Sequence, residues 1–166
     1  QELDIILWRV GQSLMPDGQL PGFSGFQVDT FEFLRELSEN NTEAWMHGGD
    51  DTNEQRYRRV VREPLRKLLE TVGPDMAELD PALETEGKGA KLMATIYKHS
   101  ADAEGAYYPY LWGAFYRKGR RKRRDVQLYV RAGVDGVGVG VDINRSVGTD
   151  VMSQFRQNVR AFPPHS

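Results

Sequence analysis

Apolar residues in the first half of the chain recur at helical spacing. They return every three or four positions in three stretches, residues 4–15, 29–38 and 53–72. This period is that of an amphipathic helix with one buried side. Asp29 with Glu32 three positions later is typical of a capping box, which places the start of the second helix at Asp29. The sequence therefore predicts three helices before residue 73.

Prolines mark irregular points in the third stretch. Pro64 lies inside it, has no backbone N–H group and crowds the preceding turn. We therefore expect the helix to kink or to split near Glu63. The pair Gly73-Pro74 follows the last apolar position, and such a pair is typical of a helix end.

The apolar period changes to two after residue 90. Stretches rich in β-branched and aromatic residues predict four strands, over residues 92–97, 111–117, 126–131 and 137–143. Their connections are too short for crossover helices, the first excepted, so a mostly antiparallel sheet is expected. Residues 150–161 predict a C-terminal amphipathic helix. The result is an α+β fold, with N-terminal helices packed on a sheet of about four or more strands and a helix at the C-terminus.

The last predicted strand has two unlike faces. Its branched residues share one face, and Gly138, Gly140 and Asp142 share the other. Bare glycines on a strand face usually mean that another backbone or a ligand comes close. Close packing of a helix is the favoured interpretation, and a ligand is the alternative.

Composition is that of an ordinary globular domain. The 166 residues are 39% hydrophobic and 28% charged, which predicts one domain over residues 1–162. Pro163-Pro164 predicts that residues 163–166 begin a linker or tail of a longer protein. The chain has no cysteine, so disulfides are excluded and a reducing, cytoplasmic location is expected. No apolar stretch nears the roughly 18 residues of a membrane helix, so no membrane partner is expected.

Charge is unevenly distributed, although the net charge is only −2. Residues 1–50 hold nine acidic side chains against two basic ones, whereas residues 117–166 hold eleven basic side chains against four acidic ones. This separation gives the domain an acidic part and a basic part. Such a pattern bears on the choice of partner rather than on the fold.

Four motifs stand out in order along the middle of the chain. They are the run from Phe31 to Asn41 with Trp45 shortly after, Val61-Arg62-Glu63-Pro64-Leu65, Ile96-Tyr97-Lys98 and Gly113-Ala114-Phe115-Tyr116. In this order they resemble domain-of-unknown-function family 2461, an uncharacterised and mainly bacterial family. The resemblance extends over roughly residues 23 to 145. It implies an α+β fold, and it implies no activity.

One segment departs from the family pattern. Members usually place a basic segment before a Pro-Tyr-Lys motif, whereas here Pro109-Tyr110 is followed by Leu111 and the basic residues before it are missing. Domains of this kind are also similar to amino-terminal regions of some McrB-like AAA+ restriction proteins, where that position reads DNA for a downstream motor. By this analogy we expect a non-catalytic DNA-binding specificity module. Its partners would be DNA, modified DNA included, and downstream domains of the same polypeptide.

The strongest local signal is a basic run between two predicted strands. Seven cations in eight residues repel one another unless they are solvated or face a polyanion. Neutralising phosphates releases counterions, so such a loop favours nucleic-acid binding. A solvated charge run is the alternative. The expected nucleic-acid-binding residues are Arg117, Lys118, Arg120, Arg121, Lys122, Arg123 and Arg124.

Aromatic residues cluster directly before the basic run. Rings near a cationic track are typical of base-stacking surfaces, and we expect Tyr108, Tyr110 and Trp112 to contact bases. Strand alternation places Tyr110 and Trp112 on one face. A flipped base, if one is bound, would need two rings there. The alternative is a place in the sheet core, which is favoured for Phe115 and equally weighted for Tyr107 and Tyr108.

The third predicted helix is basic on its polar side. Its cations are interleaved with Glu54, Glu63 and Glu70, which favours i,i+4 ion pairs on a solvated helix face over a binding site. The cations concerned are Arg56, Arg58, Arg59, Arg62, Arg66 and Lys67.

Catalytic patterns are weak, and no catalytic residue, metal or cofactor is predicted. Asp75, Glu86 and Lys88 have the residue types of a metal-dependent nuclease, but they do not lie on adjacent predicted strands. His47 near Asp50 and Asp51 has no second His or Cys. Two alternatives to the DNA-binding module remain open. They are a protein–protein interaction domain with an acidic partner, and a cryptic metal-dependent nuclease.

Overall fold

Helices precede strands in the computed structural model, which describes residues 23–48, 52–86, 91–98, 105–122 and 124–143 with the single positions 153 and 157. The order is α2 (Val28–Glu39), α3 (Glu43–His47), α4 (Asn53–Tyr57), η1 (Arg58–Arg62), α5 (Glu63–Leu79), β1 (Leu83–Glu84), β2 (Tyr110–Arg117), β3 (Val126–Gly133) and β4 (Gly136–Ile143). The predicted α+β class is confirmed. The helices predicted over residues 4–15 and 150–161 lie outside the described residues, positions 153 and 157 excepted.

Helix α2 begins before the predicted cap. Its N-cap is Gln27, whose side chain makes no capping hydrogen bond, and Asp29 lies in the first turn. The prediction that Asp29 caps this helix is therefore wrong. The Asp29 carboxylate instead accepts hydrogen bonds from two nitrogens of Arg56 on α4, at 3.1 and 2.5 Å.

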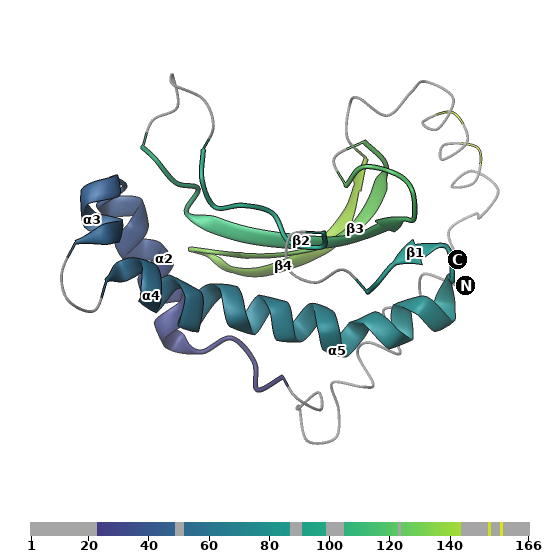
Figure 1. Ribbon diagram of the computed structural model, residues 1–166, viewed down its shortest axis with the longest axis horizontal. Coiled ribbons are helices and arrows are strands. Elements are labelled where there is room, and N and C mark those ends of the chain that lie inside the picture. The colour runs from purple at the N-terminus through teal and green to yellow at the C-terminus, as the bar shows by residue number, and fades with distance from the viewer. Residues whose placement is uncertain are drawn as a thin grey trace, which may run out of the picture.

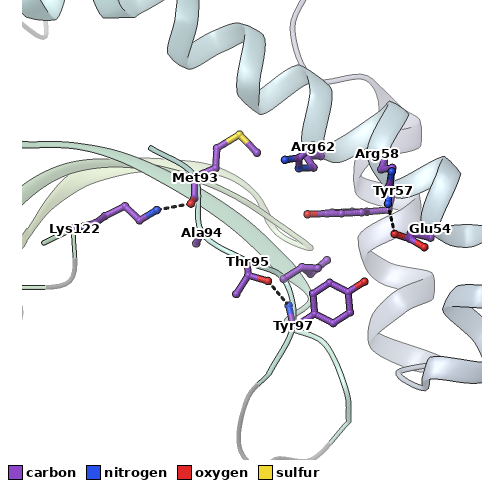
Figure 2. A pocket seen from close by; sticks show the side chains of 10 residues that line it. Glu54, Tyr57, Arg58, Arg62, Met93, Ala94, Thr95, Tyr97 and Lys122 are labelled. Carbon is purple, nitrogen blue, oxygen red and sulfur yellow. Dashed lines mark hydrogen bonds and ion pairs between the residues drawn. The ribbon is translucent and has the colours of Figure 1, made fainter. Parts of the chain in front are cut away.

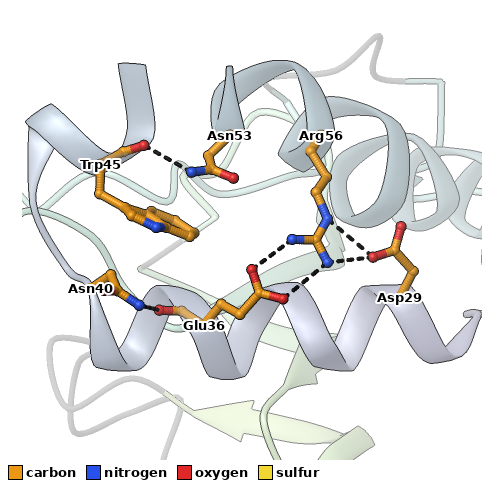
Figure 3. A network of polar contacts seen from close by, with 6 residues as sticks. All are labelled: Asp29, Glu36, Asn40, Trp45, Asn53 and Arg56. Atoms are coloured by element: carbon orange, nitrogen blue, oxygen red, sulfur yellow. Dashed lines mark hydrogen bonds and ion pairs between the residues drawn. The ribbon is translucent and has the colours of Figure 1, made fainter. Parts of the chain in front are cut away.

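Arg56 fastens α4 to α2 (Figure 3). Its guanidinium also donates to both oxygens of Glu36, at 2.6 and 3.2 Å, and lies 5.4 Å from the centre of the Phe33 ring. The Glu36 hydrogen bond raises the pKa of Arg56 above its usual value, and the bond to Asp29 adds to this effect. Asn53, also on α4, donates to the Trp45 carbonyl at 2.9 Å, so α3 belongs to the same cluster.

One wide turn, η1, joins α4 to α5 directly before Pro64. The Glu63 N–H donates to the Arg58 carbonyl, five residues back, which is the π-helical pattern. Pro64 has no N–H to offer the Val60 carbonyl, and the buried Thr30 hydroxyl donates to that carbonyl at 2.6 Å. The expected irregularity near Glu63 is confirmed, as a π turn in a continuing helix.

Helix α5 runs through Gly73 and Pro74 to Leu79, so the prediction that this pair ends the helix is wrong. Met76 is buried one turn further on, and burial on the core side outweighs the single backbone donor that Pro74 lacks. Gly73 has a packing role here. A Cβ at this position would lie 3.2 Å from the Thr85 carbonyl oxygen.

The described strands form an antiparallel sheet in the order β1-β2-β3-β4. The mostly antiparallel sheet predicted from the four strand patterns is confirmed for β2, β3 and β4, which pair in sequence order. The prediction of a continuous strand over residues 92–97 is wrong. This segment forms two isolated bridges instead, Met93 with Gly113 and Tyr97 with Tyr107. The register shifts between the two bridges, because Met93 and Tyr97 are four positions apart whereas their partners Gly113 and Tyr107 are six positions apart, so the ladder does not continue.

Helix α5 runs along one face of the sheet, and α2, α3 and α4 gather toward one end (Figure 1). Leu69 of α5 approaches the sheet closely at Gly113, where a Cβ would lie 2.5 Å from Leu69 Cδ1. On the same face, Val139 of β4 is exposed within the described residues. None of the described helices is long and apolar enough to span a bilayer. The buried core joins helices to sheet through residues that include Leu65, Leu69, Leu111, Phe115 and Val130.

Candidate functional site

The sheet face opposite α5 carries aromatic and polar side chains in register. Trp112 on β2 pairs with Arg131 on β3, which pairs with Gly138 on β4. One row away, Tyr129 pairs with Gly140. Alternation therefore brings side chains from all three long strands onto one surface.

Aromatic rings and cations alternate on this surface. The Arg131 guanidinium lies 4.0 Å from the centre of the Tyr110 ring, and the Tyr110 ring lies 5.2 Å from that of Tyr108. Lys98 Nζ is 5.6 Å from the Tyr108 ring. Lys122 Nζ is 5.5 Å from the Trp112 ring. We call this surface the aromatic–cationic face, formed by Lys98, Tyr108, Tyr110, Trp112, Lys122, Tyr129 and Arg131.

The structure brings together four of the residues predicted to bind nucleic acid. Tyr108, Tyr110 and Trp112 lie on the face, and Lys122 reaches it from the loop between β2 and β3. Sequence reasoning missed Arg131, although period-two alternation within the predicted strand 126–131 already sets it on the same side as Tyr129.

The basic run, residues 117–124, is called the basic loop from here on. Three of its cations have partners within the protein. Arg117 donates to both oxygens of Asp125, at 2.9 and 2.6 Å. Lys118 Nζ donates to the Pro81 carbonyl at 2.9 Å. Lys122 Nζ donates to the Met93 carbonyl and also lies over the Trp112 ring, so it contacts both residues. These contacts hold the loop against the rest of the fold.

The other loop cations point to solvent. Arg120, Arg121 and Arg124 are exposed, and their side chains make no contact with another described residue that would neutralise them. Arg123 lies outside the described residues. The outward cations of the loop are therefore available to a polyanion, whereas Arg117 is engaged by Asp125.

Asp125 anchors the loop from inside. It is 2% exposed although it is ionisable. The hydrogen bonds from Arg117 hold the pKa of its carboxyl below the usual value, against the opposing effect of burial, and backbone N–H groups of Val126 and Arg117 contribute. The same pair raises the pKa of Arg117. A buried carboxylate with these donors stays ionised at neutral pH.

A hollow of about 240 Å³ lies in the aromatic–cationic face, lined by Trp112, Gln127, Tyr129, Arg131 and Asp142. Gln127 is 3% exposed, and its Nε2 donates to Asp142 Oδ2 at 2.8 Å. Its Oε1 has no hydrogen-bond partner among the described residues. Buried acceptors are nearly always satisfied, so this oxygen marks a place for a donor. We call this feature the Gln127 hollow.

The glycines of β4 open onto this face. A Cβ at Gly138 would meet nothing within 4 Å, and a Cβ at Gly140 would lie 3.1 Å from the Tyr129 ring. The expected close packing of a helix on these glycines is not what the described residues show, because α5 contacts the opposite face at Gly113. Gly140 instead makes room for a ring, and Gly138 leaves the surface bare.

A larger cleft of about 640 Å³ separates the α4–η1 turns from the 93–97 segment. Figure 2 shows Arg58 and Arg62 on the helical side and Lys122 on the other. Glu54, at the cleft wall, accepts from Arg58 at 2.6 Å and lies 3.2 Å from His47 Nδ1. The Arg58 hydrogen bond lowers the pKa of Glu54. The cleft has a cationic rim that continues through Lys122 to the aromatic–cationic face.

Three of the six cations of the third predicted helix, Arg56, Arg58 and Arg66, form ion pairs. The expected i,i+4 pairs are confirmed for Arg58 with Glu54 and for Arg66 with Glu70. Arg66 also binds Glu63, whose pKa this contact lowers. This part of the helix is a solvated, self-paired surface, as predicted.

Some aromatic residues belong to the core. Tyr107 is fully buried, so the core alternative applies to it, and its hydroxyl lies 3.3 Å from His47 Nε2. Burial raises the pKa of Tyr107. Phe115 is buried as expected, and Trp45 packs against Phe33 with ring centres 5.7 Å apart.

The described residues contain no cluster of metal-ligand side chains. No group of three or more His, Asp or Glu side chains there could hold a metal ion. Asp75 lies within α5, and Glu86 follows β1. Lys88, Asp50 and Asp51 lie outside the described residues.

Comparisons with known proteins identify a family and nothing closer. No curated protein and no solved structure matches the chain. Residues 29–165, most of the chain, match the family described as conserved hypothetical protein (DUF2461). The helical and strand motifs that carried the resemblance lie within this span. The chain therefore belongs to the DUF2461 family.

Proposed function

We propose that this domain binds DNA, without catalysis of its own, through the aromatic–cationic face and the adjoining basic loop. The observation that carries the proposal is the alternation of rings and cations on one sheet face, with Arg131 4.0 Å from the Tyr110 ring and Lys122 5.5 Å from the Trp112 ring. Rings stack on bases, and cations attract phosphates, so the combination favours unpaired nucleotides laid across the sheet.

The basic loop and the aromatic–cationic face would contact different parts of the DNA. Arg120, Arg121 and Arg124 would contact phosphates, since they are exposed and point to solvent. Arg117 and Lys118 would act by holding the loop in place through Asp125 and the Pro81 carbonyl. Each stacked base contributes roughly 1–3 kcal/mol, whereas the phosphate contacts give affinity that falls as salt is added.

The wider setting is also part of the proposal. We infer a cytoplasmic DNA-reading domain of an McrB-like AAA+ restriction protein, with downstream domains of the same polypeptide as partners and modified DNA among its ligands. What supports this setting is the analogy with such amino-terminal domains and the absence of cysteine. A binding panel of plain and modified DNA tests it, because a reader of modified bases binds them in preference.

The test of DNA binding compares two charge-matched variants. One replaces Arg120, Arg121 and Arg124 with Ala, and the control replaces the exposed Arg35, Arg59 and Lys67 with Ala, away from the face. Affinity for an unpaired DNA strand of about twelve nucleotides is measured by fluorescence anisotropy over a range of salt. The loop variant should lose about two units of the salt slope, since each single-strand phosphate contact contributes about 0.7. The control should keep the wild-type slope.

A further variant separates the contribution of base stacking from that of charge. Trp112→Ala should weaken DNA binding by roughly 1–3 kcal/mol and leave the binding of heparin, a polyanion without bases, unchanged. Equal weakening for DNA and heparin, or no weakening for either, would reduce the surface to a general polyanion site. No salt-dependent DNA binding by the wild type would refute the proposal outright.

A further inference from the structure

Two side chains that carry acceptor oxygens, Gln127 and Asp142, line the Gln127 hollow and are joined by a hydrogen bond. The Gln127 amide nitrogen faces Asp142 and donates to its carboxylate oxygen, so the amide oxygen points elsewhere. Gln127 Oε1 is then left as a buried acceptor with no partner in the described residues. The Asp142 carboxylate has about four lone-pair sites, so it keeps acceptor capacity beyond the one bond from Gln127. A ligand that fits must bring two neighbouring donors.

The rest of the hollow complements a flat polar ring. Trp112 and Tyr129 contribute aromatic rings to its lining, and Arg131 contributes N–H donors. A volume of about 240 Å³ is below the range of roughly 300–1,000 Å³ typical of drug-sized ligands, so a single base is the right scale. Neighbouring Gly138 has no side chain, and a Cβ there would meet nothing within 4 Å, so the approach is open.

Among the bases, guanine alone carries two adjacent donors on its pairing edge, N1–H and the 2-amino group. Its O6 and N7 are acceptors, and the guanidinium of arginine commonly binds this pair. Adenine and cytosine present one donor beside an acceptor, and thymine presents one donor between two acceptors. The acceptors of Gln127 and Asp142 and the donors of Arg131 therefore match guanine best.

We propose that the Gln127 hollow holds one unstacked guanine, with Gln127 and Asp142 accepting from its donor edge. This deepens the proposed function, and as a DNA-reading site it rests on that function. It makes the domain selective for an unpaired guanine within a strand that the aromatic–cationic face otherwise binds without regard to sequence.

The experiment changes the ligand and the protein separately. Thymidine strands of about twelve nucleotides carry one central guanine, one central hypoxanthine or neither, and affinities are measured by anisotropy. Hypoxanthine lacks only the 2-amino donor. Wild type should bind the guanine strand about tenfold more tightly than the other two, the scale of one good bidentate contact. Asp142→Asn should bring this ratio close to one. Asp135→Asn, in the exposed β3–β4 turn, is the charge-matched control and should keep the ratio.

Free guanosine monophosphate, titrated into the wild-type chain and followed by NMR, tests the hollow without the rest of the strand. Strand binding with no guanine preference, and no effect of Asp142→Asn on that binding, overturns the hollow and leaves the proposed function standing. Guanosine monophosphate binding that is lost in Asp142→Asn supports the hollow even if no strand binds. Binding of neither ligand overturns both proposals.

Discussion

Two buried polar contacts show how single residues settle the fold. The Thr30 hydroxyl donates to the Val60 carbonyl at 2.6 Å, and Pro64 cannot donate to this carbonyl because it has no backbone N–H group. The Asp125 carboxylate accepts hydrogen bonds from the Arg117 guanidinium, where the basic loop leaves β2. Neither partner could be predicted from the sequence, because 30 residues separate Thr30 from Val60 and the spacing of a loop does not indicate which cation turns inward.

Replacing Thr30 with Val should lower the free energy of unfolding by roughly 1–3 kcal/mol, because the Val60 carbonyl loses its donor while the shape is kept. Urea unfolding measures the change. In a Pro64→Ala background, alanine restores an N–H near that carbonyl, so the same replacement should cost less. An equal cost in both backgrounds would mean that the hydroxyl does not compensate for the proline.

The Arg117–Asp125 pair predicts a pH dependence of stability. The folded pKa of Asp125 is lowered, so its contribution is complete above the unfolded value of about 3.9 and is lost as pH falls through the folded pKa. Asp125→Asn should therefore be less stable than wild type near pH 7, by about 1–2 kcal/mol. The difference between the two proteins should shrink below about pH 4. Unfolding curves over that range check it, and a pH-independent difference would contradict it.

At the scale of elements, hydrophobic periodicity predicted α2, the α4–α5 region and β2 to β4, because long amphipathic patterns survive tertiary packing. The predictions of element bounds were wrong where packing with another part of the fold opposed the local sequence pattern. Pro74 should end α5, but the burial of Met76 extends it. Residues 92–97 have the pattern of a strand, but the register shifts between the Met93–Gly113 and Tyr97–Tyr107 bridges and the ladder stops there.

Helix α5 packs on the sheet through a missing side chain, and this predicts the effect of adding one. Gly113→Ala should lower the free energy of unfolding by about 1–3 kcal/mol, because its Cβ would lie 2.5 Å from Leu69 Cδ1 and 3.3 Å from the Leu92 carbonyl oxygen. Gly138→Ala is the matched control, since a Cβ there would meet nothing within 4 Å. If both replacements had the same effect in urea, α5 would not pack on β2 as described.

At the scale of the whole molecule, the fold separates a packed face from a polar one. Helix α5 packs on one sheet face at β2 (Figure 1), and Val139 of β4 stays exposed on that face. The other face presents rings and cations from several segments. Alternation predicted that Tyr110 and Trp112 share a face. It could not place Arg131 over Tyr110 or join Gln127 to Asp142, because strand register depends on turns and packing that one sequence does not reveal.

The most direct measurement of the central claim is the location of bound DNA. A ¹⁵N-labelled chain, titrated with an unpaired strand of about twelve nucleotides and followed by backbone amide shifts, should respond at Trp112, Gln127, Tyr129 and Arg131 and in the basic loop. Residues on the α5 side of the sheet should stay unchanged. Shifts confined to α5 or to the α2–α4 cluster, or no shifts at all, would contradict the account.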